Sequence, residues 1–63
     1  MTPQAKQALQ YVINTGGNAT VASLDDDFEP IGAMLRRELM PTFIIERDGK
    51  LQLTEAGQAE LSK

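Results

Sequence analysis

The chain has 63 residues, a formal net charge of -3 and a pI near 4.6, and it contains neither cysteine nor histidine. A chain of this length can build one small core, which leaves it marginally stable. The lack of cysteine excludes disulfides, thiolate zinc sites and a cysteine nucleophile, and the lack of histidine removes the usual group for proton transfer near neutral pH. We therefore expect a single domain over residues 1–63, with no cofactor, no metal and no enzymatic activity.

The segment "MTPQAKQALQ" lacks the basic start and apolar run of a signal peptide, and no apolar stretch approaches the roughly 20 residues that span a bilayer. We expect a soluble, cytoplasmic protein. Its negative charge argues against indiscriminate binding to nucleic acids, because nonspecific affinity comes mainly from cations. The acids gather in "DDDFE" at residues 25–29, however, and the segment 30–50 carries four cations against three acids.

The first predicted element is a helix that begins at Pro3, with Thr2 as its N-cap, and ends at Gly16-Gly17. Five apolar residues follow the spacing of one buried stripe: Ala5, Ala8, Leu9, Val12 and Ile13. Polar residues fill the opposite side, so we expect that side to be an ordinary solvated surface.

The next segment, "NATVASLDDDFEP", allows two interpretations. If Thr20 caps a short helix, three apolar residues share its inner face: Val21, Leu24 and Phe28. If residues 19–22 form a brief strand instead, Ser23 is the cap. The second interpretation places Asp25 and Asp26 in the first helical turn, where the helix macrodipole favours negative charge, and we prefer it for that reason.

The acidic run also suggests a calcium-binding loop, because Asp25, Asp27 and Glu29 alternate along the chain. The sixth position of such a loop needs glycine and here is Pro30, and the twelfth needs glutamate and here is Arg36. We therefore expect a solvated acidic surface without a bound ion.

A further helix is predicted from Pro30 through "PIGAMLRRELM". Its inward stripe is expected to consist of Ile31, Met34, Leu35 and Leu39. Its outer face is expected to consist of Ala33, Arg36, Arg37 and Met40. Gly32 is small enough to permit close approach of another backbone or a ligand. The same pattern also fits a solvated arginine pair and a tolerated glycine.

The pair Asp48-Gly49 is a strong signal for a two-residue type I′ turn, which places Arg47 opposite Lys50 at the tip of a hairpin. Its apolar side should be covered by helices, since an isolated two-stranded hairpin is barely stable in water. The expected core residues are Ile44, Leu51 and Leu53. Thr54 then caps a closing helix in "TEAGQAELSK".

The predicted fold is therefore mainly helical with a small β-hairpin. This order of elements resembles the winged helix-turn-helix family, and "ERDGKLQLTEAGQAEL" is similar to the wing and following helix of bacterial winged-helix regulators. The resemblance implies that "PIGAMLRRELM" is a recognition helix for the major groove and that residues 47–50 form a wing tip that contacts the backbone or the minor groove. The DNA-binding residues it implies are Gly32, Ala33, Arg36, Arg37, Arg47 and Lys50.

We therefore expect a small winged-helix protein that binds double-stranded DNA, a transcriptional regulator of phage, plasmid or bacterial origin. We also expect a homodimer, because one module with four candidate cations would bind weakly. The alternative is a protein-interaction module, an adaptor or inhibitor that uses its acidic patch or an apolar surface. The residues of that alternative site are Asp25, Asp26, Asp27, Glu29, Met40 and Phe43.

Overall fold

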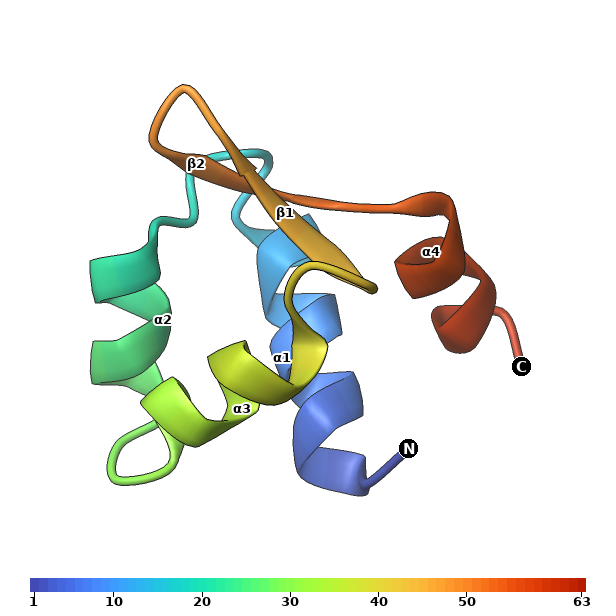
Figure 1. Ribbon diagram of the computed structural model, residues 1–63, viewed down its shortest axis with the longest axis horizontal. Coiled ribbons are helices and arrows are strands. Elements are labelled where there is room, and N and C mark those ends of the chain that lie inside the picture. The colour runs from blue at the N-terminus through green and yellow to red at the C-terminus, as the bar shows by residue number, and fades with distance from the viewer.

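The computed structural model describes residues 1–63 and contains four helices and one antiparallel hairpin. The elements in chain order are α1 (Pro3–Asn14), α2 (Val21–Asp27), α3 (Gly32–Leu39), β1 (Ile44–Arg47), β2 (Lys50–Leu53) and α4 (Glu55–Leu61). The hairpin crosses above the helices, with α2 and α4 at opposite ends of the view in Figure 1. The prediction of a mainly helical chain with one hairpin is confirmed. None of the helices combines the length and the apolar character needed to cross a membrane.

A single core joins the first three helices to the hairpin. It consists of ten buried apolar residues: Ala5, Ala8, Leu9, Val12, Ala19, Leu24, Leu35, Leu39, Ile44 and Leu51. The hairpin contributes Ile44 and Leu51, which confirms that helices cover its apolar side. Leu53, the third residue expected on that side, is only partly buried but packs against the same core.

Helix α1 begins as predicted. The Thr2 hydroxyl accepts a hydrogen bond from the Ala5 amide at 3.2 Å, and Pro3 occupies the first turn. Four of the five residues predicted for the stripe are buried, but Ile13 is 49% exposed, so its assignment to the core was wrong. Both Val12 and Ile13 border an open groove next to β2 and α4, but Val12 packs into the core whereas Ile13 does not.

Helix α2 begins after Thr20, so the preferred assignment of Ser23 as its N-cap was wrong. The Thr20 hydroxyl accepts from the Ser23 amide at 3.1 Å, and the Ser23 hydroxyl accepts from the Thr20 amide at 2.9 Å. This reciprocal capping box satisfies two amides that the helix itself leaves free. Asp25 and Asp26 therefore lie in the last turn of α2 rather than the first. The apolar residues expected from the Thr20 cap all contact the core: Val21, Leu24 and Phe28.

Helix α3 begins later than predicted, at Gly32, and its orientation depends on contact with α2. Gly32 is buried, and a Cβ added to it would lie 2.6 Å from the Cα of Asp25 and 2.7 Å from its carbonyl oxygen. Leu35 and Leu39 are buried as expected. Met34, which the spacing placed in the inward stripe, is 56% exposed, so that assignment was wrong. The close contact at Gly32 accounts for this rotation of the helix.

The hairpin confirms the predicted turn and register. Asp48 and Gly49 have positive φ angles of 54° and 77°, and the strands pair in the register that this turn dictates. No strand forms at residues 19–22, but the Leu51 amide donates to the Ala19 carbonyl at 2.8 Å. One backbone hydrogen bond therefore ties the hairpin to the segment before α2.

Helix α4 begins after Thr54, as predicted. The Thr54 hydroxyl accepts from the Gly57 amide at 3.1 Å and donates to the Thr42 carbonyl at 2.6 Å. Gly57 is buried directly against the Phe43 carbonyl, where a side chain would have no room. The cap and this contact together hold α4 against the base of the hairpin.

Candidate nucleic-acid interface

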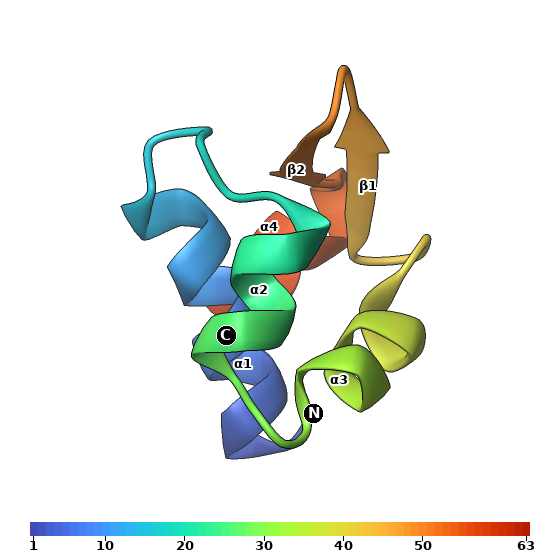
Figure 2. The ribbon, with the colours of Figure 1, turned by 90° about the vertical axis from the view of Figure 1, so that its left-hand side faces the viewer.

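Helix α3 and the hairpin lie on the same side of the molecule. In Figure 2 they follow the right-hand edge, with α3 below, the hairpin turn at the top and α2 next to α3. Every residue of the predicted DNA-binding set belongs to α3 or to the two strands. The fold thus places these two consecutive segments, which residues 40–43 connect, on one side of the molecule.

The hairpin tip carries two unpaired cations. Arg47 and Lys50 are exposed and lie opposite each other on either side of the turn. The chain contains two ion pairs, which join Arg36 to Asp25 and Lys63 to Glu60, so neither cation of the tip is engaged. Asp48, between them, reduces the net charge of the tip. The structure places these two predicted residues where a flat or grooved partner can reach them.

The two arginines of α3 differ in their surroundings. Arg37 is exposed and unpaired, as predicted. Arg36 is partly buried against α2: its Nε donates to Asp25 Oδ1 and its Nη2 donates to Asp25 Oδ2, both at 3.1 Å. These hydrogen bonds raise the pKa of the Arg36 guanidinium, and the charge on Glu46 adds to the effect. The prediction that both arginines point freely outward was therefore wrong for Arg36.

The ion pair follows from where α2 ends. Asp25 lies in the last turn of α2, close to the partially negative end of the helix, which disfavours a carboxylate. Arg36 offsets that charge from the neighbouring helix. This pair was not predicted, because the preferred cap at Ser23 places Asp25 in a first helical turn, where a carboxylate needs no cation. The Thr20 interpretation would have indicated the pair. It places Asp25 near the C-terminal end of a helix, where the macrodipole disfavours a carboxylate unless a cation offsets its charge.

The other predicted residues of α3 are less accessible than expected. Gly32 is buried, and the close approach that it permits is to the backbone of α2. Ala33 is partly buried. The exposed positions of α3 are instead Met34, Arg37 and Glu38. The outward face of this helix therefore carries one cation, one acid and one large apolar side chain.

The residues of the alternative protein-binding site fall into two groups. Met40 and Phe43 are partly buried and pack against the core, so they do not form the exposed apolar surface that was predicted. Asp26, Asp27 and Glu29 are exposed, as expected of a solvated acidic surface. No group of acidic side chains is arranged to hold a metal ion.

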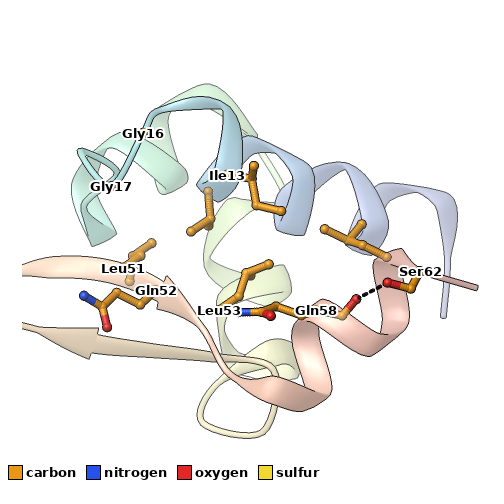
Figure 3. Close-up of a pocket in the computed structure, with 10 residues that line it drawn as sticks. Ile13, Gly16, Gly17, Leu51, Gln52, Leu53, Gln58 and Ser62 are labelled. Carbon is orange, nitrogen blue, oxygen red and sulfur yellow. Dashed lines mark hydrogen bonds between the residues drawn. The ribbon is translucent and has the colours of Figure 1, made fainter.

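An open groove of about 610 Å³ lies between the end of α1, β2 and α4 (Figure 3). Ile13 and Leu53 line it from different elements, together with the polar side chains of Gln52 and Gln58. None of its lining residues is charged, and none comes from α3 or the hairpin tip. The groove thus lacks groups for proton transfer, and it is separate from the candidate interface.

Comparisons with known proteins give no match for this chain. No family model matches it, and neither does any curated protein or any solved structure.

Proposed function

We propose that the chain is a small winged helix-turn-helix protein that binds double-stranded DNA. In this proposal α3 enters the major groove and the hairpin tip contacts the adjacent backbone. One observation carries the proposal: three of the four unpaired cations, Arg37, Arg47 and Lys50, lie on elements that share one side of the fold. Neutralising phosphates with such cations is the main source of DNA affinity.

The packing of α2 and α3 supports the same interpretation. In a helix-turn-helix, the second helix lies in the major groove while the first helix packs against it and crosses the DNA backbone. Gly32 allows α3 to lie directly on the backbone of α2, and Arg37 remains exposed on the other side. The hairpin follows α3 after a short connection, so its cations extend the surface of the helix.

The overall charge of -3 limits how tightly one copy can bind DNA. Two copies on neighbouring half-sites would sum their phosphate contacts and offset the repulsion from the acidic residues. A homodimeric transcriptional regulator of phage, plasmid or bacterial origin is therefore the form of this function that we propose.

A salt titration tests the proposal. Binding to mixed-sequence duplex DNA is measured by fluorescence anisotropy over a series of salt concentrations, for the parent and for Arg37→Gln, Arg47→Gln and Lys50→Gln. Each substitution should shallow the slope of log K against log salt by about 0.9, because each removes one phosphate contact. Lys6→Gln is the matched control: it makes the same charge change on α1 and should leave the slope unchanged. Equal slopes for the parent and all four variants would contradict the proposed interface.

A protein-binding role is the second candidate, and the exposure of Met34 favours it. This side chain is 56% exposed on α3, the helix that packs against α2, and the last turn of α2 carries the exposed acids Asp26 and Asp27. A basic partner with an apolar contact residue would fit such a surface. This role predicts no DNA affinity even at low salt, and loss of the partner when Asp26 and Asp27 are changed to asparagine. Salt-dependent binding of the parent chain to DNA would exclude it as the main function.

A further inference from the structure

The ion pair between α2 and α3 uses only one edge of the Arg36 guanidinium. Nε and Nη2 donate along the side of the group to the two carboxylate oxygens of Asp25, each at 3.1 Å. A guanidinium also carries parallel N–H donors at its end, one on Nη1 and one on Nη2. Nη1 makes no hydrogen bond within the chain, so this end edge is available to a ligand.

Two contacts along the seam between α2 and α3 fix the position of the pair. Gly32 lies against the backbone of Asp25, and Arg36, one helical turn further along α3, bonds to the side chain of the same residue. The side chains of Arg36 and Asp25 keep 28% and 31% of their surface exposed. Arg36 is therefore held in one orientation at the surface of the helix proposed to enter the major groove.

We infer that Asp25 is a positioning residue for Arg36, and that the free end edge of Arg36 donates to O6 and N7 of a guanine in the major groove. Bidentate contact between arginine and these two acceptors is the commonest specific contact in protein–DNA complexes. The inference rests on the DNA-binding role proposed above and names the base that Arg36 recognises. The unpaired cations Arg37, Arg47 and Lys50 then hold the backbone, while Arg36 supplies sequence recognition.

If Asp25 positions Arg36, removing the charge of Asp25 should have opposite effects on nonspecific DNA binding and on the preference for guanine. A carboxylate near the DNA repels phosphates, so removing the charge of Asp25 should strengthen nonspecific binding. It also removes one of the two acceptors that hold the long Arg36 side chain, so part of its ordering must then take place when it binds the base. Nonspecific affinity should therefore rise while preference for guanine falls, a split that a purely structural ion pair would not produce.

The first test identifies the guanine that Arg36 recognises. The parent chain selects its preferred site from duplexes with a randomised centre, and each guanine of that site is then replaced by adenine or by 7-deazaguanine, which lacks the N7 acceptor. Replacing the guanine bound by Arg36 with adenine should weaken binding roughly 5- to 150-fold. Arg36→Lys keeps the charge but loses the planar fork, so it should lower this preference and leave the salt slope unchanged.

The second test separates positioning from charge. Asp25→Asn should lower the guanine preference several-fold and raise affinity for mixed-sequence DNA. Asp26→Asn is the matched control, because it makes the same charge change at an exposed neighbour that does not bond to Arg36. It should raise nonspecific affinity and leave the guanine preference intact. Thermal melts of both variants show whether each is folded. Should Asp25→Asn unfold, Asp25→Glu provides the decisive comparison, because it keeps the charge but displaces the carboxylate, and so should lower the guanine preference without raising nonspecific affinity.

The possible failures are distinguishable. If the parent binds DNA with salt-dependent affinity but no guanine depends on Arg36, the guanine inference is overturned and the proposed function stands. If Asp25→Asn keeps the guanine preference of the parent, Asp25 does not position Arg36. If the parent shows no salt-dependent binding, the proposed function and this inference both fail.

Discussion

The hairpin and the α2–α3 pair supply the two halves of the candidate interface, and they are built differently. The shape of the hairpin follows from adjacent residues, because a two-residue turn at Asp48-Gly49 sets the whole register. The geometry of α2 and α3 depends on residues far apart in the chain: Gly32 against Asp25, and Arg36 bonded to the same residue. One half of the interface is thus locally determined, whereas the other exists only when two helices have packed.

The largest expected effect tests whether the hairpin also depends on distant contacts. Leu51→Ala should lower the free energy of unfolding by about 2 to 5 kcal/mol, since Leu51 is completely buried and its loss leaves a cavity. Leu53→Ala should have a smaller effect, because Leu53 is only partly buried. Urea unfolding monitored by circular dichroism measures both, with Gln52→Ala at the exposed position between them as the control. A Leu53 effect equal to that of Leu51 would mean that the core extends further beneath the hairpin than the structure shows.

The next prediction tests the contact between α2 and α3 through the substitution Gly32→Ala. Whether this substitution raises or lowers the stability of the chain is decisive. Alanine is favoured over glycine by about 1 kcal/mol in a helix, so Gly32→Ala would stabilise the chain if there were room for the methyl group. The structure leaves no room, because the new Cβ would lie 2.6 Å from the Cα of Asp25. We therefore expect destabilisation of about 1 to 3 kcal/mol, as for other overpacked sites. A thermal melt of Gly32→Ala measures the sign, and a higher melting temperature would contradict the described packing.

The hairpin turn should respond to backbone geometry rather than to charge. Gly49 has a φ of 77°, a conformation that costs an L-residue about 1 to 2 kcal/mol, and more for a β-branched one. Gly49→Val should therefore destabilise the hairpin, whereas Lys50→Ala, at an exposed position, should change stability by less than about 0.5 kcal/mol. NMR amide shifts over residues 43–53 report whether the strands remain paired. Similar shifts in the two variants would show that the turn does not depend on this glycine.

Local signals allowed most of the fold to be predicted. The Thr2 cap, the Asp48-Gly49 turn and the Thr54 cap each depend on residues within a few positions of one another, and each was predicted correctly. Exposure of the hairpin cations followed from the same turn.

The remaining features depend on packing that no local pattern encodes. Which face of α3 turns inward is decided at Gly32, by a backbone that lies in α2. The periodicity of "PIGAMLRRELM" fitted Met34 and Leu35 into the inward stripe equally well, so it could not distinguish the exposed residue from the buried one. The pairing of Arg36 with Asp25 needs both this rotation of α3 and the earlier start of α2, and neither was predicted.

The smallest effect concerns α2, where two candidate caps lie three residues apart. Thr20 and Ser23 exchange hydrogen bonds, and the helix begins after Thr20. Thr20→Ala should lower stability by about 1 kcal/mol, because it removes the N-cap acceptor of the helix. Ser23→Ala should cost less, since Thr20 still caps the helix and only the reciprocal bond is lost. Urea midpoints for the two variants test this order. A larger effect of Ser23→Ala would instead place the start of the helix at Ser23 and return Asp25 to its first turn, which would remove the reason for its pairing with Arg36.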